Sequence, residues 1–295
     1  MARHAIQQLR FNNTLYPGIA GWQFDPGTDI NSDALDSTVH ETAHHGMASA
    51  PTFDLSTRDL GFLSVLADST DVWLKACDTT NGIEAIGGKA ATDGPGWASS
   101  TVHLVRKAAR GVLLGTGITW SKGGKAELAL RGMGISADGT TAAISTSTIA
   151  LPTQPTPDMG WKLSALTLNN TSISAVDSLE ISVDPRASFD YLAGLPEPTG
   201  ILMAGVNGPA MWRMSAAIGD CESGSGTAAV SSVFKKLATG GGFSGAANST
   251  LTITFNSLWS IEQSVGGQSG TPMSRSLLVL PRYNGSTKPV TWAFS

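Results

Sequence analysis

The chain has 295 residues, of which 34 are glycine, and a formal net charge of −4 at pH 7. Only 14% of its residues are charged, against about 25% in a typical globular domain, which argues against a nucleic-acid-binding protein because phosphate contacts need clustered Lys and Arg. The apolar share of 41% supports a sizeable core, and the length allows one large domain or two of about 150 residues each.

The first half of the chain is typical of short strands separated by turns. The expected strands are Leu15–Phe24, Pro51–Leu55, Asp71–Asp78, Ile83–Ile86, Thr101–Trp120, Lys125–Ile135 and Thr140–Leu151. Asn81-Gly82 predicts a tight hairpin between the third and fourth of these. Leu60, Leu63 and Leu66 stand at helical spacing after a capping residue, Ser56 or Thr57, and they predict a helix of about two to three turns.

Two segments of the first half separate or interrupt these elements. Residues 25–50 are polar and match no clear strand or helix pattern, so we expect a long loop. Three prolines in residues 152–158 predict a stiff, extended linker close to mid-chain. The sequence therefore predicts an N-terminal β-rich unit at 1–151 and a C-terminal β-rich unit at 159–295.

The second half continues the pattern of alternating strands. The expected strands are Trp161–Leu168, Val176–Val183, Ile201–Val206, Met211–Ile218, Leu251–Phe255, Ser276–Leu280 and Pro289–Phe294, and the last two should form a hairpin around Asn284-Gly285. A second helix is expected at Thr227–Ala238, and it should end at Gly240. The expected fold class is mainly β, with antiparallel sandwich or barrel units that each carry one flanking helix.

One motif suggests metal chemistry. His40, Glu41 and His44 match the H-E-x-x-H pattern, in which two histidines on one helix face bind zinc and the glutamate polarises a bound water. The segment lacks an apolar stripe, however, and Met47 and Ala50 stand where zinc proteases of this kind place a glycine and a third histidine. We therefore expect a solvated polar loop and no metal site, with zinc as the alternative.

Other catalytic patterns are absent from the sequence. No G-x-S-x-G stands in the chain, and the glycine runs lack the Lys-Ser/Thr of a phosphate loop. Asp184, Asp190 and Glu197 could pair as glycosidase carboxylates, as such residues could in any Ser-rich β protein. We expect no catalytic residue and no cofactor. Cys77 and Cys221 lie far apart in the sequence, which favours two unpaired thiols in a protein assembled in the cytoplasm.

Membrane insertion and secretion are not expected. No run approaches the roughly 18 apolar residues of a membrane-spanning helix, and the first ten residues lack the apolar core of a secretion signal.

Four stretches of the sequence carry a resemblance to a known family. They are the strand Leu15–Phe24 with its polar loop, the pair Trp161–Leu168 and Val176–Val183 ending in Asp184-Pro185, the segment Ile201–Ile218 with a turn at Asn207-Gly208, and the helix Thr227–Ala238 before the strand LTITF. This pattern resembles the tail tube (major tail) proteins of long-tailed bacteriophages. Many members of that family are nearer half this length, so the resemblance suggests two tube units in one chain, or one unit with an insertion or an appended domain.

The resemblance implies a virion structural protein that is assembled in the host cytoplasm and has no enzymatic activity. Its copies would form stacked rings, with strands pairing between subunits into a tube, and genomic DNA would pass through the lumen without sequence-specific binding. Further partners would be other tail proteins, such as the tape measure and terminator proteins. The long loop 25–50 is the segment we expect to dock on the next ring.

Three alternatives stay open at this point. The chain could be another virion component, such as a capsid decoration, baseplate or fibre protein. It could be a β-sandwich carbohydrate-binding module, or an enzyme that acts through His40, Glu41 and His44.

Overall fold

The structure is a computed structural model of the chain. It describes residues 4–295 except 17, 28–29, 34–42, 47–48, 67–71, 79–81, 90, 92–97, 99, 154–159, 204–210, 219–228, 257, 267–273, 284–285 and 287. The described chain is mainly β and its strands pair antiparallel, which confirms the mainly β, antiparallel part of the expected fold class.

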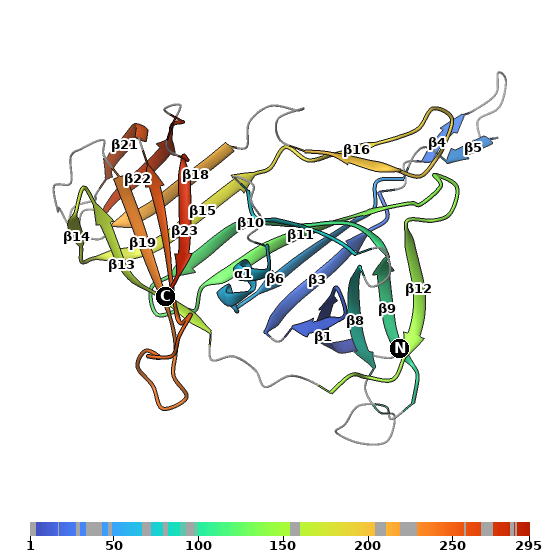
Figure 1. Cartoon of the computed structure of the whole chain (residues 1–295), viewed down its shortest axis with the longest axis horizontal. Coiled ribbons are helices and arrows are strands. Elements are labelled where there is room, and N and C mark those ends of the chain that lie inside the picture. Colours follow the sequence, from blue (N-terminus) through green and yellow to red (C-terminus); the bar gives the residue numbers. More distant parts are fainter. Residues whose placement is uncertain are drawn as a thin grey trace.

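The largest sheet has nine strands and is called the central sheet (Figure 1). Its strand order is β21-β22-β18-β15-β10-β11-β6-β3, and β7 also pairs with β10. The strands are β3 (Ile19–Asp25), β6 (Thr52–Thr57), β7 (Leu74–Ala76), β10 (Arg110–Ser121), β11 (Glu127–Ile135), β15 (Val176–Asp184), β18 (Met211–Ile218), β21 (Leu258–Gly266) and β22 (Ser274–Pro281).

Two five-stranded sheets pack against the central sheet. The N-terminal sheet has the order β12-β9-β8-β1-β2, and the C-terminal sheet has the order β14-β13-β19-β20-β23. The N-terminal sheet contains β1 (His4–Phe11), β2 (Thr14–Tyr16), β8 (Ile83–Lys89), β9 (His103–Ala108) and β12 (Ile144–Ile149). The C-terminal sheet contains β13 (Trp161–Leu168), β14 (Thr171–Ile173), β19 (Ala229–Lys236), β20 (Thr250–Asn256) and β23 (Val290–Phe294).

Two small antiparallel pairs complete the described strands. The arm consists of β4 (Ile30–Asp33) and β5 (Ala43–Gly46), and the ribbon consists of β16 (Ser188–Asp190) and β17 (Gly200–Leu202). The helical segments are the 3-10 turn η1 (Leu60–Phe62) and α1 (Leu63–Leu66), in the region where the first helix is expected. Neither described helical segment is long enough to cross a membrane.

One continuous core joins the three large sheets. It contains Ile83 of the N-terminal sheet, Leu130 of the central sheet and Phe255 of the C-terminal sheet, all buried. The N-terminal sheet lies so close that a Cβ added at Gly132 would meet Cδ1 of Ile83 at 2.8 Å. Strand side chains alternate between the two faces of a sheet. One face of the central sheet therefore packs into this core, and the opposite face, called the outward face, points away from it.

Aromatic rings hold the C-terminal sheet to the central sheet. The ring centroids of Trp73 and Trp212 lie 4.9 Å apart and edge to face, and Trp212 lies 6.4 Å from Phe255 of β20. Edge-to-face pairs at such distances stabilise a core beyond the area they bury.

The central sheet contains strands from both expected units. In particular, β10 pairs with β15 over Gly117–Ser121 and Ser178–Ser182. Most of the expected linker, 152–158, lies outside the described residues, so the division into units at 1–151 and 159–295 stays a prediction.

The prediction of a second helix near 227–238 is wrong. Its described part, Ala229–Lys236, is strand β19, which pairs with β13 on one side and β20 on the other. Val230, Ser232 and Phe234 are buried and their neighbours less so, which is the two-residue period of a strand. Hydrogen-bonding partners on both sides outweigh a helix propensity that is only a weak preference.

Three other expectations about local structure also need correction. The segment 25–50 is not loop throughout, because β4 and β5 pair within it. The strands on either side of Asn81-Gly82 do not form a hairpin, since β7 pairs with β10 and β8 with β1 and β9. Likewise, β22 and β23 belong to different sheets. A turn signal specifies a local reversal of the chain, but the partner of each strand is chosen by distant residues. Asn81, Asn284 and Gly285 lie outside the described residues.

Candidate interaction surfaces

The zinc motif is not built as its chemistry requires. His44 lies in strand β5, in register with Ser32 of β4. The zinc alternative requires a helix at this position, and that helix is not formed. On a strand, positions four apart are separated by about 13 Å, against one helical turn in a zinc-binding helix. His40 and Glu41 lie outside the described residues. Within the part of the chain that the structure describes, no group of three His, Cys, Asp or Glu side chains could hold a metal ion.

The three carboxylates considered for glycosidase chemistry are placed as follows. Asp184 ends β15, and its Oδ1 accepts a hydrogen bond from the backbone N–H of Arg186 at 2.8 Å. Asp190 ends β16. Glu197 follows the ribbon strand β16, and its Oε2 accepts a hydrogen bond from Ser49. The bonds to Asp184 and Glu197 order loops, which is a structural role.

The cysteines offer no reactive thiol in the described chain. Cys77 is free and partly buried. Burial, and secondarily the charge of Asp78, raises the pKa of the Cys77 thiol to about 12. The thiol is therefore protonated at neutral pH, whereas the thiolate is the nucleophile. Cys221 lies outside the described residues.

The outward face of the central sheet is a broad surface of small and hydroxyl side chains. One register row crosses six strands, from β3 to β18, and consists of Gly21, Ser56, Ala129, Gly117, Ser182 and Arg213. Five of these six residues are glycine, alanine or serine, so little side-chain volume projects from the row between β3 and β15.

The charged side chains of this face are mostly acidic. At outward positions of β3, β6, β11, β10, β15 and β18 there are five acidic side chains and three basic ones: Asp25, Asp54, Glu127, Glu180 and Asp184, against Arg110, Arg131 and Arg213. Arg131 Nε and Asp54 Oδ1 form an ion pair at 3.0 Å, and both side chains are about half exposed. The face therefore repels a polyanion on balance.

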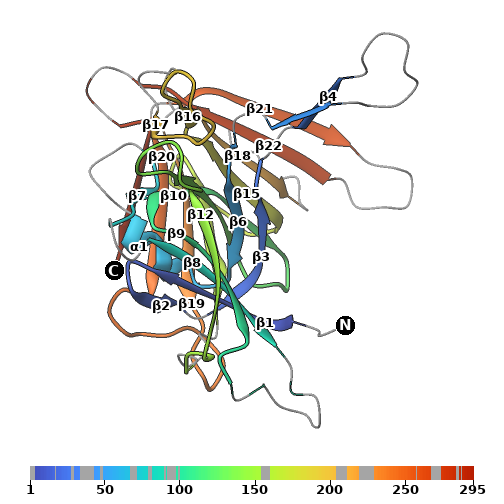
Figure 2. The ribbon, with the colours of Figure 1, turned by 90° about the vertical axis from the view of Figure 1, so that its right-hand side faces the viewer.

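The arm stands away from the three large sheets, at one end of the molecule (Figure 1, Figure 2). At its base, the backbone N–H of Ala50 donates a hydrogen bond to the carbonyl of Gly27 at 3.1 Å. Gly27 has φ = +56°, and a Cβ there would come within 2.3 Å of the Ala50 carbonyl oxygen. Only glycine fits this crossing of the two chain segments.

A segment of the second half holds the base of the arm at Ser49. The Ser49 N–H donates to the carbonyl of Pro196 at 2.8 Å, and Ser49 Oγ donates to Glu197 Oε2 at 2.6 Å. The Tyr191 hydroxyl donates to the Ser49 carbonyl at 2.7 Å. Glu197 Oε2 also accepts from the N–H of Ala143 at 3.1 Å. These contacts are called the Ser49 clamp, and they fix where the arm leaves the body.

The ribbon connects this clamp to the central sheet. Phe189 and Ile201 of the ribbon pack on Val112 and Leu114 of β10 and Met133 of β11. This small cluster covers part of the outward face of the central sheet. The arm is thus held through the ribbon to the sheet itself.

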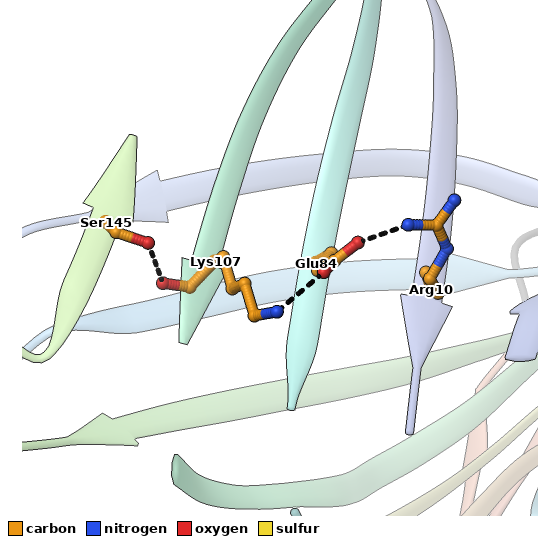
Figure 3. A network of polar contacts seen from close by, with 4 residues as sticks. All are labelled: Arg10, Glu84, Lys107 and Ser145. Carbon is orange, nitrogen blue, oxygen red and sulfur yellow. Dashed lines mark hydrogen bonds and ion pairs between the residues drawn. The ribbon is translucent and has the colours of Figure 1, made fainter. Parts of the chain in front are cut away.

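A charged ladder crosses the N-terminal sheet (Figure 3). Glu84 of β8 lies between Arg10 of β1 and Lys107 of β9, with N–O distances of 2.8 and 3.0 Å. Ser145 of β12 continues the row, and its Oγ donates to the Lys107 carbonyl at 3.4 Å. The Glu84 side chain is only 10% exposed, so its two cations are needed to compensate the burial of its charge.

The outer strand of this sheet, β12, is unusually exposed. It reads Ile144-Ser-Thr-Ser-Thr-Ile149 and pairs with β9. Its four central residues are exposed although they alternate between the two faces of the sheet.

Comparison with known proteins assigns the chain to no family. No protein-family model matches the sequence, and no curated protein matches it. The function is therefore inferred from the surfaces described above.

The sequence pointed to the segment 25–50 as a docking segment but did not reveal three features of these surfaces. It did not find the outward face of the central sheet, the Ser49 clamp or the open edge at β12. The uncharged, β-branched run ISTSTI was a visible signal for an edge strand. The clamp had no local signal, because Ser49 and Glu197 are 148 positions apart in sequence.

Proposed function

We propose that this chain is a tail tube subunit of a long-tailed bacteriophage. Copies of it would assemble into stacked rings that form the conduit for DNA ejection. The observation that carries the proposal is the central sheet, whose outward face is rich in small and hydroxyl side chains and acidic on balance.

Ring closure would use the ends of the central sheet. The strands β3 and β21 stand at the two ends of its strand order. A terminal strand offers backbone N–H and C=O groups that pair readily with another chain. If β21 of one copy lies beside β3 of the next, the contact is head to tail, and it closes into a ring when the rotation per copy divides a full turn.

The passage for DNA would be lined by the outward face of the central sheet. Specific DNA binding requires clustered cations, and each phosphate contact would retard movement of the duplex. The five acidic side chains on this face, against three basic ones, repel phosphate instead. The Gly, Ser and Ala residues of the row, which ends at Arg213, place little side-chain volume in the path of the duplex.

Stacking of rings would use the arm. It extends beyond the three large sheets, and the Ser49 clamp fixes its base. A preformed arm loses less conformational entropy on docking than a free loop does. The proposed partners are further copies of the chain, other tail proteins such as the tape measure and terminator proteins, and DNA in the lumen.

The test is negative-stain electron microscopy of the purified protein at rising concentration. The proposal expects rings or hollow tubes. A variant lacking residues 28–48 should keep its far-ultraviolet circular dichroism spectrum and its unfolding midpoint but form no tubes. Monomers at every concentration, also after addition of preformed tail tips, would contradict the proposal. Tubes formed by the deletion variant would contradict the role of the arm.

A further inference from the structure

The two halves of the chain have the same strand order. Read from one edge to the other, the N-terminal sheet is β2-β1-β8-β9-β12 and the C-terminal sheet is β14-β13-β19-β20-β23. In the central sheet, the first half contributes β3-β6-β11-β10 and the second half contributes β15-β18-β22-β21. With β7, the arm and the ribbon set aside, each strand of the first half therefore has a counterpart at the same place in the second half.

Both halves also begin with the same hairpin. Asn12-Asn13 joins β1 to β2, Asn169-Asn170 joins β13 to β14, and all four residues have positive φ, as in a type I′ turn. The backbone N–H of Asn12 donates to the carbonyl of Gly82, and that of Asn169 donates to the carbonyl of Ala229, at 2.9 and 3.0 Å. Gly82 precedes β8 and Ala229 begins β19, so the two turns are held by counterpart strands.

Register shifts occur at matching places as well. The strand β3 shifts against β6 between Ile19 and Gly21, and β15 shifts against β18 between Val176 and Ser178. Each shift directly follows the first residue of its strand. The pairs β1–β8 and β13–β19 also shift near the beginning of β1 and β13. Bulges are specific local features, so their recurrence supports one structural unit present twice.

Inside the chain, the two halves of the central sheet are joined through β10 and β15. Ile118 of β10 lies opposite Ile181 of β15, and both side chains are buried. Thr119 lies opposite Glu180 in the next pair. The counterparts of β10 and β15 are β21 and β3, which stand at the two ends of the central sheet and, within the described chain, pair with one strand each. The two kinds of strand that meet inside the chain therefore recur at the ends of the sheet.

One register row identifies the counterpart residues. From the first residue of β3 and of β15, it crosses four strands through Ile19, Thr57, Leu128 and Ile118 in the first half, and through Val176, Ile218, Arg275 and Val265 in the second. Val265 is thus the counterpart of Ile118, and Gly266 follows it as Thr119 follows Ile118. By the same count along β3 and β15, Phe24 corresponds to Ile181 and Gln23 to Glu180.

We propose that the chain is a tandem repeat of one unit and that the join between β10 and β15 recurs between copies, with β21 of one copy beside β3 of the next. In that contact Val265 lies opposite Phe24, and Gly266 lies opposite Gln23. This inference rests on the proposed function, because it gives the register of the contact that closes the ring. A ring would then contain twice as many units as chains.

The residues at this contact suit the pairing. Phe24 is partly buried against the core, and Phe24 and Val265 are both apolar, as Ile118 and Ile181 are at the internal join. Gln23 and Gly266 are exposed, and a Cβ added at Gly266 would meet nothing within 4 Å. Neither pair brings like charges together, so the two edges can add to each other as antiparallel strands.

The first experiment detects the register by disulfide formation. A chain with Gln23→Cys and Gly266→Cys, in a Cys221→Ser background, is oxidised with copper phenanthroline during assembly and run on a non-reducing gel. Residues that face each other across a pair of strands meet the distance that a disulfide needs, so a series of linked copies is expected. Within one copy the two positions lie on the terminal strands of the central sheet, seven strand spacings of about 4.8 Å apart, so the link must join different copies.

Two matched controls frame this result. Thr119→Cys with Glu180→Cys occupies the equivalent pair inside the chain and should form its disulfide within a single copy, whether or not assembly occurs. Gln23→Cys with Ser264→Cys moves one partner by two residues along β21. Such diagonal neighbours are about 7–8 Å apart, beyond the reach of a relaxed disulfide, so linkage should be at least about five-fold slower.

The second experiment tests the same register through charge. Gly266→Glu with Gln23→Glu places like charges opposite each other, whereas Gly266→Glu with Gln23→Lys places opposite charges there. The like-charged protein should need an at least about three-fold higher concentration for assembly, and the difference should shrink in 0.5 M NaCl. The single variants Gln23→Glu and Gln23→Lys correct for contacts within a copy, because Gln23 lies opposite Asp54 of β6.

The outcomes distinguish the two proposals. Tubes that link positions 23 and 264 as readily as 23 and 266, tubes that link neither pair, or equal assembly of the corrected charge variants would overturn the repeated register and leave the tube proposal standing. Linkage of 23 to 266 in a protein that forms open chains and no tubes would support the repeated join and overturn the tube proposal. A protein that stays monomeric at every concentration and links neither pair would overturn both.

Discussion

The indole Nε1–H of Trp161 donates a hydrogen bond to Oδ1 of Asp59 at 3.1 Å. Trp161 is the first residue of β13 in the second half, and Asp59 caps the 3-10 turn η1 in the first half by accepting from the N–H of Gly61 at 2.9 Å. One carboxylate oxygen thus serves both halves of the chain, at a point where Trp161 is buried.

Asp59→Ala should destabilise the protein by about 2–3 kcal/mol, because it removes a cap and leaves a buried indole N–H without its acceptor. The free energy of unfolding from urea titration checks this value. Trp161→Phe removes the same indole bond and leaves the cap intact, but its loss also includes the cost of the buried ring volume that it removes. An unchanged free energy of unfolding in Asp59→Ala would contradict a stabilising role of either bond.

Glu84→Gln should lower the free energy of unfolding by about 1–3 kcal/mol. The change leaves the partly buried cations of Arg10 and Lys107 without a compensating charge. Asp54→Asn breaks the half-exposed ion pair with Arg131 and should cost at most about 1 kcal/mol. Thermal and urea unfolding of the two variants compares a buried with an exposed pair. If Asp54→Asn lowered the free energy of unfolding more than Glu84→Gln does, the buried ladder would not be the more stabilising of the two ion pairs.

Cys77 should resist alkylation in the folded protein. Burial raises the pKa of its thiol from 9.0 to about 12, so iodoacetamide at pH 8 should modify it slowly in buffer and rapidly in urea. The same shift makes stability depend on pH. The unfolded chain releases the thiol proton first, so stability is complete below about pH 9 and falls as the pH rises toward 12. In Cys77→Ser, the free energy of unfolding should therefore fall less between pH 8 and pH 10.5 than in the wild type. Urea unfolding at the two pH values measures this difference.

Tyr191→Phe should loosen the base of the arm while the core stays intact. It removes the hydroxyl that donates to the Ser49 carbonyl and keeps the aromatic ring. Hydrogen exchange of the backbone amides of β5 and residues 49–50 should accelerate by roughly five-fold, with no change in β13, β19 and β20. Tyr283→Phe, at a tyrosine that is 62% exposed, is the control. Unchanged exchange at the arm would mean that the clamp does not hold it.

Strand positions could be predicted where the alternation of side chains is strong. The predicted bounds of Trp161–Leu168 and Met211–Ile218 match β13 and β18, because one face of each meets the core and the other does not. The prediction of a helix at 227–238 failed because Ala, Lys and Leu favour a helix locally. In the folded chain, β13 and β20 provide hydrogen-bonding partners on both sides of this segment.

Pairing between strands could not be predicted in the same way. No local signal near Ser178–Ser182 indicates that this segment pairs with β10, and the outward face of the central sheet exists only once that pairing is known. The surfaces proposed for assembly were therefore hidden from the sequence, apart from the polar segment 25–50. Local patterns specify which residues face a core, and distant contacts decide which strands lie next to each other.

The pairing of β10 with β15 also has a consequence for synthesis of the protein on the ribosome. The central sheet cannot be completed until residues beyond β15 have emerged, and β22 and β21 are added only near the end of translation. Folding is slow when contacts span long sequence separations, and exposed strand edges invite aggregation in the interval. A nascent first half therefore depends on prompt translation of the second, and a ribosome stalled at mid-chain would release an insoluble fragment.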